Sequence, residues 1–267
     1  MVGYVLHTLY FLYKRCTEMS DKGVVCFYHK GCMDGWASAF VVYTFMKLHG
    51  MENDVDFIAV HYGDTPVDVT DKEVYVVDFS FPRDTLLEME VQAESLLVID
   101  HHKTAQEALQ GLDFCVFDMG MCGATLTWKT LMGEYAEVPP ILKYVEDRDL
   151  WNWQLESSRE VSEALRTYPM EFSTWEDIIE PDYIHTLISE GGLLLKKKNE
   201  EIGSIIERCT THIEFEGYRV PCVNSSMYQS EIGNIISEPN GVMFGIIWYI
   251  NKDGMLVCSL RSNKEHG

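Results

Sequence analysis

The sequence predicts an α/β protein, with a mostly parallel sheet followed by a smaller α/β lobe. Short apolar runs in the first 120 residues have the length and composition of buried strands, at 24–28, 56–61, 73–78, 96–100 and 114–117. Stretches with helical spacing lie between several of them, at 36–48, 82–92 and 104–109. This alternation is typical of βαβ units, which place their strands in parallel.

Composition limits the function classes. The 267 residues are 46% hydrophobic and 24% charged, which is enough for a substantial core. The net charge of -21, from 42 acidic and 21 basic residues, excludes strong non-specific binding of long duplex nucleic acid but not of small phosphorylated substrates. Eight cysteines without a Cys-x-x-Cys pair favour a reducing, cytoplasmic location. The apolar run at 5–13 is too short to span a bilayer, so no membrane association is expected.

Polar residues follow three of the predicted strands, at the point where each strand ends. The carboxyl ends of parallel strands form the edge at which ligands collect, so these side chains are expected to lie together. A single Asp there would more often cap a helix or form a turn. Three strand ends that supply three His and three Asp instead favour two or more bound cations. The residues are His29, Cys32 and Asp34, then Asp78, then Asp100, His101 and His102.

Such a cluster suits one kind of chemistry. Divalent cations held by carboxylate and imidazole can polarise a phosphoryl oxygen and supply a hydroxide nucleophile near neutral pH. The sequence therefore predicts metal-assisted hydrolysis of phosphoester or phosphoanhydride bonds.

Four segments resemble the DHH phosphoesterases, a family that includes RecJ-type exonucleases, nanoRNases, cyclic-dinucleotide phosphodiesterases, exopolyphosphatases and family II pyrophosphatases. VIDHHKTA at 98–105 carries the signature Asp100-His101-His102, and VVDFS places Asp78 in a second motif. GMCGATLTW at 120–128 resembles the family's small-residue helix start, where Gly123 could approach substrate or support the residues of the site. ILKYVEDRDLW at 141–151 resembles its fourth motif.

The first motif departs from the usual His-x-Asp-x-Asp-Gly. HKGCMDG has one extra residue and places Cys32 where the first Asp would fall, while Asp34 and Gly35 align. It resembles a branch of the family with a His-x-x-Cys-x-Asp-Gly start. Cys32 is then a metal ligand, a neighbour of the ligands, or a small buried residue.

The resemblance implies a role for each site residue. His29 and Asp34 would bind a first metal, Asp78 would bridge two, and His101 and Asp147 would complete the second coordination sphere. Asp149 is the alternative to Asp147, which is preferred on its spacing to Trp151. His102 would stabilise or protonate the leaving group, and Asp100 would fix the geometry. Two Mn(II) ions are expected, with Mg(II) or Co(II) as weaker substitutes.

The resemblance also divides the chain. We expect an N-terminal extension at 1–22, a DHH domain at 23–185, a linker helix at 186–212, and a partial DHH-associated C-terminal domain at 213–267. That domain lacks the family's Gly-Gly-Gly-His segment, which leaves Arg261 as the candidate phosphate contact and predicts weak substrate binding.

Two functions remain open on the sequence alone. The favoured one is hydrolysis of short oligonucleotides, cyclic or linear dinucleotides, or polyphosphate. The alternative is a catalytically weakened DHH-fold binding or assembly module. The oligomeric state, including a homodimer, is left open.

Overall fold

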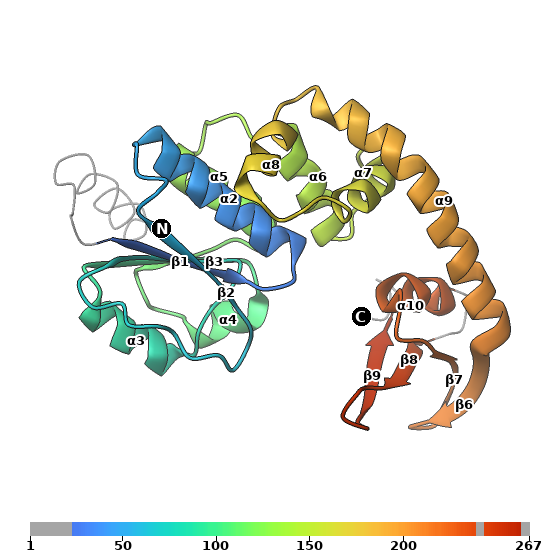
Figure 1. Ribbon diagram of the computed structural model, residues 1–267. Coiled ribbons are helices and arrows are strands. Elements are labelled where there is room, and N and C mark those ends of the chain that lie inside the picture. Colours follow the sequence, from blue (N-terminus) through green and yellow to red (C-terminus); the bar gives the residue numbers. More distant parts are fainter. Residues whose placement is uncertain (1–22, 239–242, 263–267) are drawn as a thin grey trace. The chain divides into compact units, whose positions relative to one another are not determined.

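A computed structural model describes residues 23–238 and 243–262 (Figure 1). The N-terminal extension expected at 1–22 lies outside the described residues. The chain divides into two compact units between Gly191 and Gly192, and each is considered by itself.

The first unit contains a five-stranded parallel sheet with the strand order β2-β1-β3-β4-β5. This architecture confirms the α/β class predicted from the apolar runs. The strands are β1 (Val24–His29), β2 (Val55–Val60), β3 (Glu73–Val77), β4 (Ser95–Asp100) and β5 (Cys115–Phe117).

Both faces of this sheet are covered, which explains why its central strands are continuously apolar. In β1, Val25 and Phe27 belong to one core cluster, together with Leu86 and Met89 of α3 (Arg83–Gln92). The alternating residue Cys26 belongs to the other cluster, with α2 (Met33–Leu48) and α5 (Gly123–Met132). Figure 1 shows α2 and α5 on one side of the sheet, and α3 and α4 (Lys103–Ala108) on the other.

Three further helices extend the layer that contains α2, namely α6 (Pro140–Asp149), α7 (Ser158–Leu165) and α8 (Phe172–Ile178). The ring of Phe172 stacks on Trp36 of α2 with a centroid separation of 4.9 Å. Trp175 is 1% exposed and is therefore a core residue. Ile141, Leu142 and Val145 of α6 belong to the same core cluster, and the C-terminal end of α6 carries the fourth motif.

The second unit has a four-stranded mixed sheet in the order β6-β7-β8-β9. Its strands are β6 (Thr210–Phe215), β7 (Tyr218–Asn224), β8 (Gly245–Ile250) and β9 (Leu256–Arg261). Val223 and Ile247 pack with Ile232 of α10 (Gln229–Ser237). A turn at 251–254 joins the antiparallel strands β8 and β9.

The long helix α9 (Tyr183–Cys209) ends before residue 212, the expected end of the linker helix. Thr210 begins strand β6, which pairs with β7 from Thr210↔Val223 onward. Threonine, isoleucine and phenylalanine in TTHIEF favour a strand, and pairing with β7 stabilises it. The sequence pattern missed this strand because the helical spacing before it is so regular.

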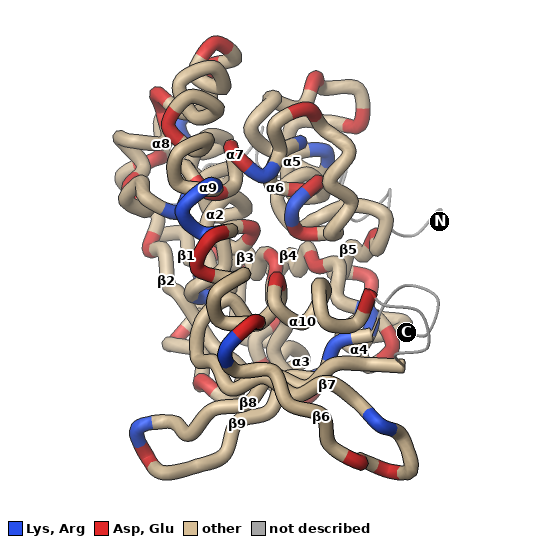
Figure 2. Tube along the Cα trace, turned by 90° about the vertical axis from the view of Figure 1, so that its right-hand side faces the viewer, with Lys and Arg blue, Asp and Glu red and all other residues tan. Residues whose placement is uncertain are grey.

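The charge distribution follows the acidic composition. Figure 2 shows basic residues interspersed among more numerous acidic ones in both units. In the part of the chain that the structure describes, no helix is both long and apolar enough to cross a membrane.

Candidate metal centre

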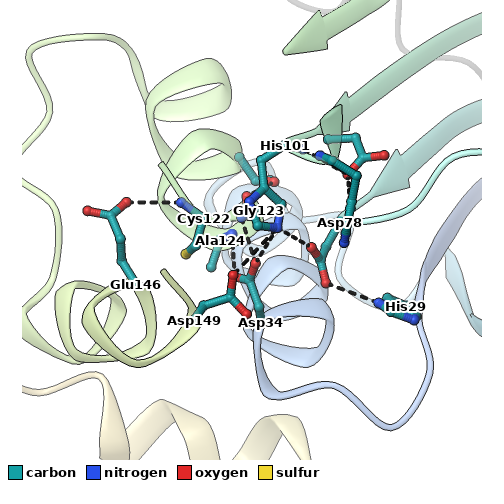
Figure 3. Close-up of polar contacts among 12 residues, drawn as sticks. His29, Asp34, Asp78, His101, Cys122, Gly123, Ala124, Glu146 and Asp149 are labelled. Atoms are coloured by element: carbon teal, nitrogen blue, oxygen red, sulfur yellow. Dashed lines mark hydrogen bonds and ion pairs between the residues drawn. The ribbon is translucent and has the colours of Figure 1, made fainter. Parts of the chain in front are cut away.

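The polar residues predicted at the ends of three strands lie close together beyond the carboxyl ends of β1, β3 and β4 (Figure 3). Three overlapping groups have candidate ligand atoms within 4.8 Å of one another. Asp78 and His101 each belong to two of them. Shared residues are what a pair of adjacent cation sites requires. The groups are His29, Cys32 and Asp78; Asp78, His101 and His102; and Asp34, His101 and Asp149.

Asp78 lies directly after β3 and has a left-handed backbone, with a φ of 51°. Its N–H donates to the carbonyl of Ile99 at 2.9 Å, which fixes this conformation against the neighbouring strand. The side chain is 1% exposed, and both its carboxylate oxygens lack a hydrogen-bond partner among the residues described. The nearest ring nitrogens are His101 Nε2 at 3.2 Å and His29 Nδ1 at 3.7 Å.

These unpaired atoms show that the residues fit a cation. A buried carboxylate without a hydrogen bond is costly, and His29 Nδ1 is also buried and unpartnered in the described chain. Burial acts to raise the pKa of Asp78, but the His101 and His29 rings lower it below the ordinary value. Asp78 is therefore anionic, and its oxygens and the His29 nitrogen are available to a divalent cation.

Asp34 is held by the N-terminus of α5. The N–H of Gly123 donates to Asp34 Oδ2 at 2.6 Å, and that of Ala124 donates to Oδ1 at 2.8 Å. The helix dipole adds to this stabilisation of the charged form. Burial nevertheless raises the pKa of Asp34 well above its usual range, and repulsion from Asp78 and Asp149 adds to the effect. Without a cation, Asp34 therefore keeps its proton to a higher pH than an exposed aspartate does.

Glycine is required at position 123 because the side chains of Asp78 and Asp34 lie very close to its backbone. A Cβ at this position would lie 2.6 Å from Asp78 Cβ and 3.0 Å from Asp34 Oδ2, well inside ordinary contact. Two roles were expected for Gly123, namely contact with substrate and support of a site residue. The structure shows a contact of the second kind, because the Gly123 N–H donates to Asp34. A contact between this N–H and substrate stays a prediction.

His101 lies at the centre of the cluster. Its Nε2 is 3.2 Å from Asp78 Oδ1, 3.5 Å from Asp34 Oδ2 and 3.6 Å from Asp149 Oδ2. Burial acts to lower the pKa of His101, but Asp78, Asp34 and Asp149 together raise it to about 9. A proton on His101 thus partly offsets the carboxylate charge, which is what a bound cation would do.

Asp100 fixes the positions of both histidines that follow it. Its Oδ1 accepts from the N–H groups of His101 at 2.8 Å and His102 at 3.3 Å, and contacts His102 Nδ1 at 2.6 Å. Its Oδ2 accepts from Ser80 Oγ at 2.7 Å. The hydrogen bond with Asp100 raises the pKa of His102. The contact at Nδ1 leaves Nε2 of His102 for a ligand or substrate.

The extra residue of the first motif is absorbed by a turn. Gly31 has a φ of 74°, a left-handed conformation that glycine adopts without strain. The turn keeps His29 beside Asp78, and it brings Cys32 into the same group. Burial, with repulsion from Asp78, raises the pKa of the Cys32 thiol to about 12. Without a cation Cys32 is therefore a neutral thiol.

Asp149, and not Asp147, reaches the cluster. The carboxylate of Asp147 turns to the following loop, where it accepts from the N–H of Gln154 at 2.8 Å and of Leu155 at 3.2 Å. Asp149 lies 3.6 Å from His101. Residues two apart on a helix project in very different directions, so only one of the two can face the cluster. The preference for Asp147 is therefore not supported by the geometry.

Two supporting residues were missed from the sequence. Glu146 of α6 accepts from the N–H of Cys122 at 3.1 Å and from the hydroxyl of Thr125, so it holds the start of α5. Ser80 donates to Asp100. Ser80 lies within the VVDFS segment and Glu146 directly precedes Asp147. Their positions inside these motifs could have indicated from the sequence that both residues belong to the site.

Arg261 lies in the second unit, at the end of β9. Its Nη1 donates to the carbonyl of Leu260 at 3.0 Å, and its Nη2 lies 3.5 Å from Ser230 Oγ on α10. Its role as a phosphate contact stays a prediction.

Comparisons with known proteins show what the chain resembles. No family model matches the sequence. An uncharacterized protein of Acanthamoeba polyphaga mimivirus is 26% identical over 233 residues, which cover 80% of this chain and 54% of that protein. The chain thus spans about half the length of the curated relative that it matches.

Two solved structures are similar. RecJ from Thermus thermophilus, crystallised in complex with Mn2+, matches with a TM-score of 0.52 and 12% identity, over 97% of this chain and 47% of that one. An uncharacterized protein from Helicobacter pylori G27 matches with a TM-score of 0.40 and 15% identity, over 91% of this chain and 86% of that one. The first similarity shows that the chain shares the fold of RecJ.

Proposed function

We propose that this chain is a DHH-family phosphohydrolase that uses divalent cations, favouring Mn(II), to cleave phosphoester or phosphoanhydride bonds in small or short phosphorylated substrates. The sequence motifs and the fold shared with RecJ both support this assignment. Its candidate substrates are short oligonucleotides, cyclic or linear dinucleotides, and polyphosphate. Binding of long duplex nucleic acid is disfavoured, because the chain carries twice as many acidic as basic residues.

The observation that carries the proposal is Asp78. Asp78 is fully buried and no described residue donates a hydrogen bond to its oxygens; the His101 and His29 rings, at 3.2 and 3.7 Å, are its partners. Burying a carboxylate with so few donors is costly, and a bound cation would complete the site. The residues that would hold two cations are His29, Asp34, Asp78, His101 and Asp149, with Cys32 as a further candidate. When bound, such cations would supply Lewis acidity to a phosphoryl oxygen and lower the pKa of a water nucleophile.

The protein's own residues have distinct parts in this scheme. Asp100 holds the His102 ring, and the raised pKa keeps a proton on that ring at higher pH than usual. His102 can therefore donate a proton to the leaving oxygen. Gly123, Ala124 and Glu146 keep the end of α5 and Asp34 in place. Through these hydrogen bonds they position the start of α5 and the Asp34 carboxylate.

The test is hydrolysis by the full chain of a panel containing pyrophosphate, tripolyphosphate, a dinucleotide, a cyclic dinucleotide and a single-stranded oligonucleotide. Each would be assayed with Mn(II), with Mg(II) and with chelator. We expect Mn(II)-dependent release of phosphate or nucleotide from at least one substrate. Hydrolysis of none would favour the DHH-fold binding module.

A pair of variants tests the division of roles. His101→Ala should lose bound Mn(II) and activity together, because His101 contacts three carboxylates of the cluster. His102→Ala should retain Mn(II) and lose turnover, by about 100-fold or more for a lost general acid. Equal loss of Mn(II) in both variants would make His102 a ligand instead.

A further inference from the structure

A cavity of about 190 Å³ adjoins the metal cluster within the first unit. Cys32, Asp34 and Asp149 form the wall that it shares with the cluster. Its other wall comes from α6 and α7, with Arg148, Ser162 and Arg166 among the lining residues. A ligand in this cavity would therefore lie next to the group being hydrolysed.

The two arginines are the feature that sets this cavity apart. Acidic residues outnumber basic ones by 42 to 21 in this chain, so carboxylate partners are abundant. Among the described residues, however, no carboxylate forms an ion pair with Arg148 or with Arg166. Two unpaired guanidinium groups beside a cavity provide a site for an anion.

Arg148 is held in place by aromatic rings. Its guanidinium carbon lies 4.7 Å from the ring centroid of Trp151 and 5.6 Å from that of Trp153. A guanidinium against an aromatic face keeps its N–H donors in its own plane, where they remain available for an anion. The stacking thus orients Arg148 without using its hydrogen-bonding capacity.

The turn that carries these rings is strained. Trp151 and Trp153 have φ values of 56° and 55°, which bulky residues rarely adopt. Asp147 holds the turn, because its carbonyl accepts from Asn152 and Trp153 and its carboxylate accepts from Gln154 and Leu155. Strain of this kind persists where surrounding contacts fix it and is concentrated at functional sites. Here it places the rings that orient Arg148.

The size of the cavity limits its ligand. Sites for drug-sized molecules are commonly about 300–1,000 Å³, so a cavity of about 190 Å³ favours a smaller group. A tetrahedral phosphoryl group fits both this volume and the two arginines. We propose that Arg148 and Arg166 bind a second, non-scissile phosphoryl group of the substrate, beside the one that is hydrolysed. This inference rests on the proposed function and narrows its substrate class.

Two substrate types could supply that group, and matched pairs separate them. A 5′-phosphorylated dinucleotide is compared with the same dinucleotide lacking the phosphate, and pyrophosphate is compared with phenyl phosphate, which has a single phosphoryl group. Each comparison is expressed as a ratio of kcat/KM with Mn(II). We expect a ratio of at least about tenfold in one pair, the size of one charge-assisted contact. The pair that shows it identifies the source of the second phosphoryl group.

The variants are Arg166→Gln and Arg148→Gln, with Arg159→Gln as the matched control. Arg159 also lies over Trp153, at 4.3 Å, but it does not line the cavity. We expect the ratio to fall toward 1 in the first two variants and to persist in the control. Arg166 is exposed, so its replacement should not disturb folding. An unchanged ratio in Arg166→Gln and Arg148→Gln would overturn the proposal.

The cavity can also be tested if no substrate is cleaved, an outcome that would count against the proposed function alone. Binding of pyrophosphate to the Mn(II)-treated protein is then measured by titration calorimetry. Weaker binding by Arg166→Gln than by the wild type and Arg159→Gln would support the phosphoryl site. Equal binding by all three proteins, or none by the wild type, would refute it.

Discussion

The two units of this protein both bury charged side chains, but they do so in opposite ways. In the second unit, Lys198 of α9 is 7% exposed and donates to Glu231 of α10 at 2.6 Å, with the ring of Tyr228 5.5 Å away. In the first, Asp78 is 1% exposed and no described residue hydrogen-bonds to its oxygens. One buried charge has a lysine donor at short distance, whereas the other is approached only by the ring nitrogens of His101 and His29 among the described residues.

This difference separates a structural ion pair from a candidate functional site. Removing one partner from a buried pair leaves the other charge unsatisfied, so it destabilises the fold. Asp78 is paired with the His101 and His29 rings, but it also repels the neighbouring carboxylates of Asp34 and Asp149. Removing its charge loses the first interaction and relieves the second, so the net change in stability should be small. A substitution in the ion pair of the second unit should therefore mainly lower stability. A substitution of Asp78 in the first unit should mainly lower metal binding.

The largest effect is expected for Asp78→Asn. Asparagine tolerates the left-handed backbone at this position, so the change removes charge with little added strain. Activity should fall by more than about 100-fold, since even residues that only support ligands cost 10–100-fold. Bound Mn(II), measured by elemental analysis, should be lost. The melting temperature of the metal-free protein should change little, because the lost pairing with His101 is offset by weaker repulsion from Asp34 and Asp149. A clear fall in that temperature would remove the contrast between the units.

Lys198→Met tests the other half of the comparison. It leaves Glu231 without its close cation, which should destabilise the second unit by about 3 kcal/mol. Hydrogen–deuterium exchange of α10 and β7 should report this as lost protection, while Mn(II) binding is retained. Lys197→Met is the control, because Lys197 is exposed and its contact with Glu201, at 3.4 Å, is a surface ion pair that contributes little to stability. Equal effects of both substitutions would show that the buried pair is not structural.

The two aspartates at the end of α6 bring the same contrast into one motif. Asp149→Asn should weaken Mn(II) binding by about 10–100-fold or more, judged from the cost of altering metal-site residues. Asp147→Ala should retain Mn(II) but lower stability by about 1–2 kcal/mol, because two N–H groups lose their acceptor. Titration calorimetry and chemical denaturation of both variants measure the two quantities. The reverse pattern would restore Asp147 as the ligand.

The smallest effect concerns pH. The pKa of His101 is raised to about 9, so the metal-free cluster holds this proton at neutral pH and must release it when a cation binds. Mn(II) affinity should then increase with pH, by about tenfold per unit below pH 9 for one released proton. Calorimetry at pH 7.0 and 8.0, in buffers of different ionisation enthalpy, measures both affinity and proton release. An affinity that does not change with pH would mean that His101 is unprotonated before binding.

Much of the fold could be predicted, because the strands of the first unit are buried on both faces. A run such as VVCFY must be apolar throughout, and its polar end then marks the edge of the sheet. The strand-end residues His29, Asp34, Asp78 and His101 followed from that pattern. The start of β6 did not, because a regular helical pattern leads directly into it and pairing with β7 decides where the helix ends.

The choice between Asp147 and Asp149 could not be made from the sequence. Both lie in the last turn of α6, and the packing of that helix decides which one faces the cluster. Spacing to Trp151 favoured Asp147, but the turn that contains Trp151 is the very segment whose N–H groups Asp147 caps. A spacing rule cannot distinguish a ligand from the residue that shapes the loop beside it.

The backbone of Asp78 has a consequence for how this sequence can change over time. At a φ of 51°, glycine, asparagine and aspartate are accommodated with the least strain, and of these only aspartate carries a charge. The backbone conformation therefore favours a small set of residues at this position. In a descendant that no longer catalysed the reaction, substitution to Asn or Gly would be favoured here over substitution to larger residues. The residue at position 78 would thus help to distinguish active homologues from inactive ones.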